Sequence, residues 1–157
     1  GATAGGANTA GSISFIVTNA LSGQAIDLTP SYNATVADGA VTGITENETT
    51  EHVAIISYID GKQMIADAAW TVEFIGNNNG DTLLESGEQA VITVWLLNYT
   101  ASTYSLGTDG DDPFIDVAAD LPGIYDTFTV EVKPSKGSAL IMERTLPARI
   151  DTVMDLK

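Results

Sequence analysis

The sequence predicts an all-β protein, an antiparallel β-sandwich or barrel of the immunoglobulin-like kind. Its 157 residues include 19 Thr, 10 Ser and 15 Gly, a composition that favours short strands and turns over long helices. Short segments of alternating apolar and polar residues are separated by turn signals, as in sandwiches and barrels. With 44% apolar residues the chain can bury one core. We expect a flexible lead at residues 1–11 and a single β-sandwich domain at residues 12–157.

Three strands are expected near the start of the chain. Residues 12–18 place Ile13, Phe15 and Val17 on one face and serines on the other, the pattern of a half-buried strand. Residues 25–28 form a short second segment that ends at Thr29-Pro30. Residues 32–36 favour a third strand, which the Asp38-Gly39 turn follows.

The next part of the chain contains one clear strand signal. Residues 43–52 are polar and are expected to form a loop, whereas residues 52–59 are strongly strand-like. Asp60-Gly61 closes this strand with a turn of the hairpin type. Residues 62–68 contain few turn residues and are expected to form one helical turn or a bend.

The remaining chain is dominated by two central strands and a C-terminal hairpin. Apolar residues concentrate in segments 69–75 and 90–97, and residues 97–112 form a polar excursion with an acidic cluster at Asp109, Asp111 and Asp112. Phe128, Val130 and Val132 alternate with polar residues in the cleanest strand pattern of the chain. Residues 139–144 return as the hairpin partner of that strand, and residues 146–156 are expected to be extended. Trp70 and Trp95 lie on the central strands, where core packing is favoured over a sugar-stacking platform.

The segment between the two central strands is dense in oxygen ligands. Six groups fall at the ligand positions of an EF-hand loop counted from Asn77: the side chains of Asn77, Asn79, Asp81, Glu85 and Glu88, and the backbone carbonyl of Leu83. Thr82 replaces the glycine that such a loop needs, and strands flank it in place of helices. We expect a strand–loop–strand hairpin that holds a divalent cation, with Ca²⁺ favoured. The alternative is a solvated polar turn, because Asn, Gly and Asp are ordinary turn residues.

Charge excludes one class of partner. The net charge is −15, which argues against nucleic acid because phosphate binding needs basic clusters. Residues 133–157 carry a net charge of +2 and the rest of the chain is acidic, so the basic end could pair within the domain or with a neighbouring copy. No apolar stretch approaches the roughly 20 residues of a transmembrane helix, and no membrane contact is expected for this domain. The absence of cysteine excludes disulfides and thiolate chemistry.

No catalytic constellation is recognisable, and we expect the protein not to be an enzyme. His52 is the only histidine, and no nucleophile-elbow glycine pattern accompanies it. Carboxylate pairs such as Glu85 and Glu88 are expected by chance in so acidic a chain, so they do not indicate a catalytic acid–base pair. Three Asn-X-Ser/Thr sequons, at Asn33, Asn47 and Asn98, are candidate N-glycosylation sites if the protein is exported.

Three stretches together resemble archaellins, the archaeal flagellins. Ile16-Val17-Thr18-Asn19, followed by Ala25-Ile26-Asp27-Leu28, resembles their first paired strand segment. Residues 70–95, with Gly80-Asp81-Thr82-Leu83-Leu84-Glu85-x-Gly87-Glu88, resemble their central loop and strand. Residues 137–157, with Arg144-Thr145-x-Pro147 and Val153-x-Asp155-Leu156, are similar to their C-terminal segment. Residues 39–68 lie outside the resemblance.

The resemblance implies the outer, solvent-facing domain of a structural subunit of the archaeal motility filament, the archaellum. The partners it implies are identical or related archaellin subunits in a helical filament, with N-linked glycan on an extracellular surface. It also implies a metal site in this outer domain, and the apolar N-terminal helix of the family is not part of this sequence. The alternative is a cell-surface adhesin, or a surface-layer or carbohydrate-binding β-sandwich module with a calcium site.

Overall fold

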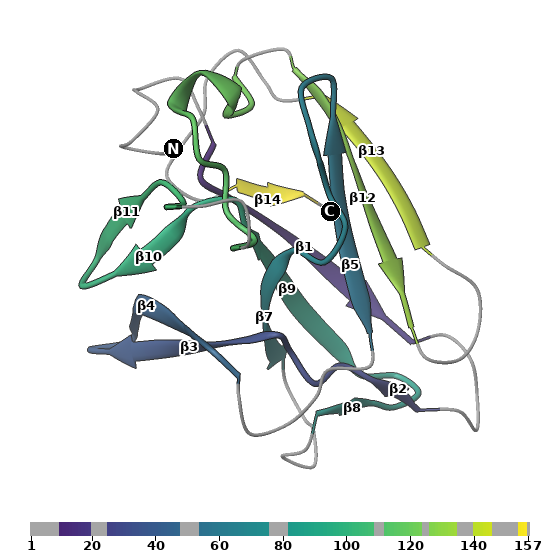
Figure 1. Ribbon diagram of the computed structural model, residues 1–157. Coiled ribbons are helices and arrows are strands. Elements are labelled where there is room, and N and C mark those ends of the chain that lie inside the picture. The colour runs from purple at the N-terminus through teal and green to yellow at the C-terminus, as the bar shows by residue number, and fades with distance from the viewer. Residues whose placement is uncertain are drawn as a thin grey trace.

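A computed structural model describes residues 10–19, 25–47, 54–75, 82–108, 112–123, 126–134, 140–145 and 154–156. In these segments the chain is all-β apart from one 3-10 helix (Figure 1). The elements are β1 (Ser12–Thr18), β2 (Ile26–Asp27), β3 (Tyr32–Ala37), β4 (Ala40–Glu46), β5 (Ile55–Asp60), β6 (Met64–Ile65), β7 (Ala69–Ile75), β8 (Leu83–Leu84), β9 (Gln89–Trp95), β10 (Asn98–Thr100), β11 (Thr103–Ser105), η1 (Ala118–Asp120), β12 (Thr127–Lys133), β13 (Leu140–Thr145) and β14 (Met154–Leu156). The prediction of an all-β protein is therefore confirmed.

The strands form several small sheets. One four-stranded sheet has the order β14-β1-β9-β7 and a second has the order β13-β12-β5-β6; β2–β8, β3–β4 and β10–β11 are two-stranded. The described strand pairs are antiparallel except that β14 runs parallel to β1, with Ile13 beside Met154. The expectation of a purely antiparallel arrangement is wrong at this pair. Alternation along a short strand specifies which face is buried, not the direction of its neighbour.

Both four-stranded sheets contribute to one hydrophobic core. Ile13 and Phe15 of β1, with Ile92 and Val94 of β9, are at most 2% exposed. From the second sheet, Ile56, Tyr58, Phe128 and Val130 join the same cluster of buried residues. The alternating burial along β12 matches the predicted pattern, because side chains on a strand point to opposite faces.

The outer face of β1 differs from the prediction. Ser12 and Ser14 were expected on a solvated face, yet both are buried. The hydroxyls of Ser12 and Tyr104 share a hydrogen bond of 3.1 Å, and those of Ser14 and Thr93 share one of 2.8 Å. The hairpin β10–β11 therefore covers this end of the sheet, and hydrogen bonding makes the burial of both serines tolerable.

That hairpin replaces the predicted polar excursion over residues 97–112. Its turn residues, Ala101 and Ser102, have φ of 50° and 62°. Such a turn is ordinarily marked by Asn or Gly, and neither is present, so the sequence carries no recognisable hairpin signal here. Tyr99 and Tyr104 stack around Trp95, with ring centroids 4.7 to 6.3 Å apart, and this aromatic contact holds the hairpin on the sheet.

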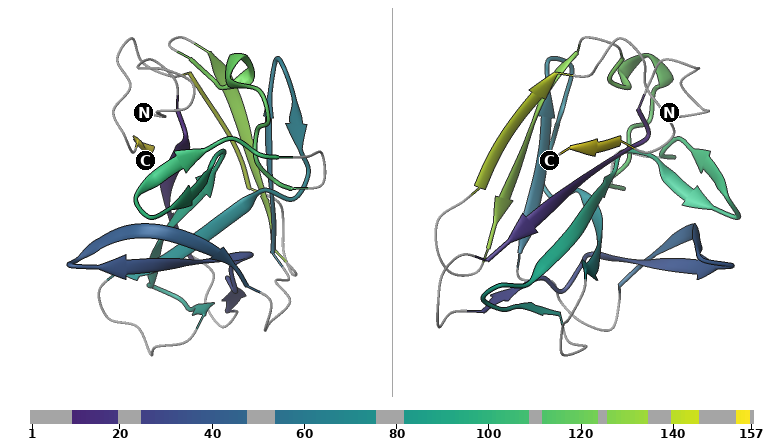
Figure 2. Two further views of the ribbon diagram at one scale, coloured as in Figure 1. Left: turned by 60° about the vertical axis from the view of Figure 1, so that its left-hand side comes forward. Right: turned by 180° about the vertical axis from the view of Figure 1, so that it is seen from behind.

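One further sequence prediction is corrected, and one open alternative is decided. Residues 43–46 belong to strand β4, not to a loop, because they pair with β3 across the Asp38-Gly39 turn. Residues 62–68 form no helical turn; they bend and include the two-residue strand β6, which pairs with β5. Hairpins β3–β4 and β10–β11 extend from the same side of the molecule, away from β12 and β13 (Figures 1 and 2).

Residues 10 and 11, the described part of the predicted flexible lead, are packed against the rest of the domain. Ala10 is buried and donates its backbone N–H to the Pro122 carbonyl at 3.0 Å. The Gly11 carbonyl accepts hydrogen bonds from the backbone N–H groups of Leu96 and Leu97. Residues 1–9, which make up most of the predicted lead, lie outside the described segments, as does His52.

Candidate functional site

The predicted cation loop connects β7 to β9, which pair as the predicted hairpin. Asn77, Asn79 and Asp81 lie outside the described residues, and Leu83, Glu85 and Glu88 lie within them. Leu83 belongs to β8, which pairs with β2 so that Asp27 lies opposite Leu83. The Asn19 amide also donates to the Leu84 carbonyl at 2.9 Å, so the loop returns to β9 through an ordered segment.

Glu85 and Glu88 close a tight turn. The Glu88 N–H donates to the Glu85 carbonyl at 3.0 Å, and the Glu85 N–H donates to the Glu88 carboxylate at 2.7 Å. Gly87 has φ of +84°, a conformation that glycine adopts without the steric cost of a side chain. One Glu88 oxygen therefore caps this turn. In the segments that the structure describes, no three carboxylate or imidazole groups gather closely enough to hold a metal, so the cation remains a prediction.

The three sequons have different surroundings. Asn33 lies on β3 in a run of exposed residues. Asn47 donates its side-chain amide to the Pro30 carbonyl at 3.0 Å, and the Asn98 side-chain oxygen accepts the Tyr99 N–H at 2.9 Å. Attachment of a glycan requires an accessible side chain, and Asn33 is exposed whereas Asn47 and Asn98 are half-buried, so Asn33 is the best placed of the three.

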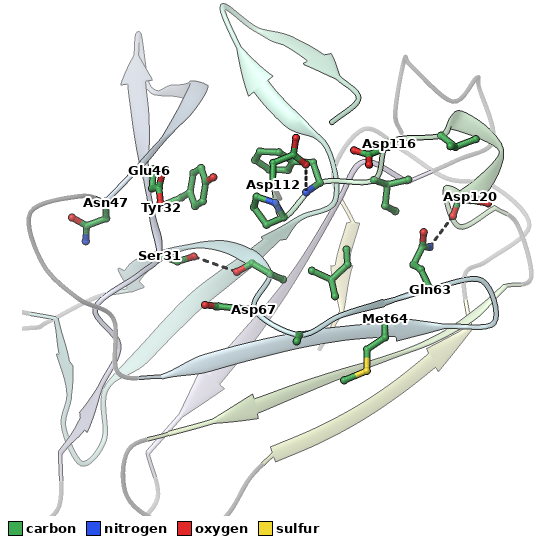
Figure 3. Close-up of a pocket in the computed structure, with 17 residues that line it drawn as sticks. Ser31, Tyr32, Glu46, Asn47, Gln63, Met64, Asp67, Asp112, Asp116 and Asp120 are labelled. Atoms are coloured by element: carbon green, nitrogen blue, oxygen red, sulfur yellow. Dashed lines mark hydrogen bonds between the residues drawn. The ribbon is translucent and has the colours of Figure 1, made fainter. Parts of the chain in front are cut away.

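A pocket of about 640 Å³ lies between hairpin β3–β4, the β5–β7 connection and the segment before η1 (Figure 3). It is lined by Ser31, Tyr32, Glu46, Asn47, residues 63–68, residues 112–117 and Asp120. Its volume falls within the roughly 300–1,000 Å³ typical of ligand sites. Sequence reasoning missed this pocket because its lining comes from four separate stretches. The acidic cluster at residues 109–112 was the single local signal.

The pocket is strongly acidic. Five carboxylates line it, those of Glu46, Asp67, Asp112, Asp116 and Asp120, and the described lining residues include no Lys or Arg. Tyr32 and Phe114 meet edge to face within it, with centroids 5.7 Å apart. Burial, followed by the negative charges of Glu46 and Asp112, raises the pKa of the Tyr32 phenol to about 12. The potential at this ring is therefore negative.

We expect stability to fall at alkaline pH, partly through Tyr32. Its folded-state pKa of about 12 lies above its ordinary value of 10.0, so the folded protein keeps a proton that the unfolded chain releases. The stabilising contribution is complete below pH 10.0 and is lost as the pH rises through about 12. Urea unfolding across this range measures it.

Tyr32→Phe is expected to make this decline shallower without abolishing it. Burial also raises the pKa values of Tyr58 and Tyr104, and both contribute in the same direction. A decline in Tyr32→Phe as steep as in the parent would contradict this account.

No family model matches the chain, and a search of curated proteins finds no match. Across the described segments, no helix combines the length and apolarity that crossing a membrane requires.

Proposed function

We propose that this chain is the outer domain of a structural subunit of an archaeal motility filament, the archaellum. The observation that carries the proposal is an apolar outer face on the sheet β13-β12-β5-β6. Ile55, Ile59, Met64 and Ile141 are 37% to 64% exposed on this sheet. Together these four side chains are called the apolar face below.

The register places the apolar face on the side of the sheet opposite the core. Val132 and Phe128 point inward, so their neighbours Glu131 and Thr129 point outward. Ile141 lies beside Glu131, and Ile59 lies beside Thr129, on this outer side. Met64 lies beside Ile59 from the edge strand β6. The same face carries the ion pair of Glu131 and Lys133, whose charged atoms lie 3.0 Å apart, so apolar and charged side chains are interspersed on it, as they are at many protein interfaces.

A repeating contact between copies suits this face. A domain with a net charge of −15 repels its own kind unless apolar burial or bound cations offset the repulsion. Burying the apolar face against a different surface of the next copy would be a head-to-tail contact, the geometry that builds helical polymers. A filament subunit of this kind requires no catalytic group.

We also propose that the two four-stranded sheets are the layers of an immunoglobulin-like β-sandwich. Support comes from the shared core, to which each sheet contributes one face. Sheets packed in this way interleave their inner side chains, as Trp70 and Val94 from one sheet and Tyr58 and Val130 from the other would do.

Surface filaments sheared from the source cells and identified by peptide mass spectrometry would test the filament proposal. We expect peptides of this chain in the filament fraction, with glycan mass on Asn33 above that on Asn47 or Asn98. Ile141→Lys should abolish incorporation into filaments, whereas Val36→Lys, an equally exposed site on β3, should be incorporated normally. Recovery only in the cell-envelope fraction would contradict the proposal and favour an adhesin or surface-layer module.

We further propose that the β7–β9 loop holds a divalent cation, and removing that cation should destabilise the domain. A ligand present well above its dissociation constant stabilises the folded state by about 3 kcal/mol, so a chelator should lower the melting temperature by roughly 5–10 °C. Asp81→Asn should remove the dependence on chelator, whereas Glu73→Gln, at an exposed position of β7, should keep it. An unchanged melt with no metal by elemental analysis would refute the site.

A further inference from the structure

We propose that the acidic pocket binds an elongated organic cation carrying primary ammonium or guanidinium groups, such as a polyamine or the lysine and arginine side chains of a peptide. This inference concerns the pocket described above and does not depend on the filament proposal. Three features carry it: the spread of the carboxylates, the apolar and aromatic part of the lining, and the lack of basic groups in that lining.

The carboxylates are distributed along the pocket, with those of Asp112 and Asp116 both close to Gly107. Glu46 lies near Tyr32 at one end and Asp120 lies at the other, with Asp67, Asp112 and Asp116 between them (Figure 3). Among the described residues they do not gather in a group of three around one point. A single metal ion needs several oxygens converging on it, whereas a chain of spaced charges needs acceptors in succession. The arrangement therefore favours a ligand with several separated positive groups.

The remaining lining suits the carbon stem of such a ligand. Ile65 of β6 and Val117, which is 52% exposed, supply apolar surface. Long cationic side chains bury their methylene stems on surfaces of this kind while their charged ends remain hydrated. The Tyr32–Phe114 pair adds aromatic rings, which attract cations through their faces.

The pocket is also framed by a hydrogen-bonded wall that does not depend on a ligand. Gln63 donates to the Asp120 carbonyl at 2.9 Å, and Ser31 donates to the Ala68 carbonyl at 3.2 Å. Ile115 donates its N–H to the Leu96 carbonyl at 2.9 Å. The first two bonds join segments of the lining to one another, and the third joins the lining to the residue that follows β9. The pocket is therefore preformed, and binding does not require ordering of its walls.

Titration of ¹⁵N-labelled protein with spermidine, and separately with an acetylated tri-lysine amide, tests the proposal at low ionic strength. Both probes should cause saturable shifts of backbone amides in residues 63–68 and 112–117. Glu46→Gln should weaken binding roughly threefold, as expected for loss of one partly exposed charge pair. Glu73→Gln removes the same charge from an exposed site on β7 outside the pocket and should leave binding unchanged.

The two probes distinguish the source of the cation. Tighter binding of the peptide than of spermidine indicates a protein partner, and the reverse order indicates a free polyamine; either result supports the pocket. Tyr32→Leu should weaken both probes, whereas Tyr32→Phe keeps the ring and should bind as the parent does. The proposal is overturned if shifts spread over the whole acidic surface, if Glu46→Gln and Glu73→Gln weaken binding equally, or if Ca²⁺ shifts these amides and neither probe does.

Discussion

Trp70→Ala is expected to lower the free energy of unfolding by about 3–5 kcal/mol, because it removes a large buried side chain and leaves a cavity. Trp70 is 0% exposed on β7, and its neighbour across the strand pair is the buried Val94 of β9. Urea unfolding of the variant and the parent measures the loss. An unchanged unfolding midpoint would show that Trp70 does not belong to the core.

The two tryptophans should differ when each is replaced by phenylalanine. The Trp70 indole N–H is buried without a hydrogen-bond partner, so Trp70→Phe removes an unsatisfied donor and should cost less than about 1.5 kcal/mol. The Trp95 N–H donates to the buried Thr71 hydroxyl at 3.0 Å, so Trp95→Phe should cost about 1–3 kcal/mol. The reverse order would mean that the Trp70 N–H has a partner in solution.

Asp60→Ala is expected to cost about 2–4 kcal/mol, because one carboxylate satisfies four donors. It accepts the hydroxyl of the fully buried Tyr58 at 2.6 Å and the backbone N–H groups of Lys62 and Gln63. It also accepts the Gln63 side-chain amide at 2.7 Å. Chemical denaturation of the variant gives the cost, and a loss below 0.5 kcal/mol would be within the range of ordinary surface substitutions.

A double-mutant cycle isolates the Tyr58 part of that effect. Tyr58→Phe removes one donor and should cost about 1 kcal/mol. If the contact is real, Asp60→Ala combined with Tyr58→Phe should cost less than the sum of the single variants. Gln63 also holds the carbonyl of Asp120, so Asp60→Ala should loosen the η1 end of the acidic pocket.

Alternation and turn chemistry were sufficient for several elements. The strand predicted over residues 12–18 matches β1, and the alternation around Phe128 matches β12 with its partner β13. Asp38-Gly39 forms the predicted turn, with φ of 53° and 79° at the two residues. These signals are local, because each depends on the steric preferences of a few neighbouring residues.

Elements whose signals are not local could not be predicted in the same way. Ala101 and Ser102 adopt left-handed conformations that neither residue type prefers. Tertiary contacts hold the hairpin there: the rings of Tyr99 and Tyr104 pack on Trp95, and the Ser102 N–H donates to the Thr42 carbonyl at 2.7 Å. Gly43 lies within strand β4, where the chain passes close to β10. A Cβ atom at this position would lie only 3.2 Å from the Tyr99 carbonyl oxygen, so the close approach favours glycine. Propensity alone disfavours glycine in a strand, and this close approach overrides it.

The candidate sites also differ in whether local sequence signals reveal them. The oxygen-rich loop, the sequons and the acidic balance are properties of adjacent residues or of composition, so the sequence alone determines them. The acidic pocket and the apolar face exist only because the fold brings distant segments together: Glu46 and Asp112 line the same pocket, and Ile59 shares the outer sheet face with Ile141. Local chemistry specifies strands and turns, whereas burial of a common core decides which of their remaining side chains meet.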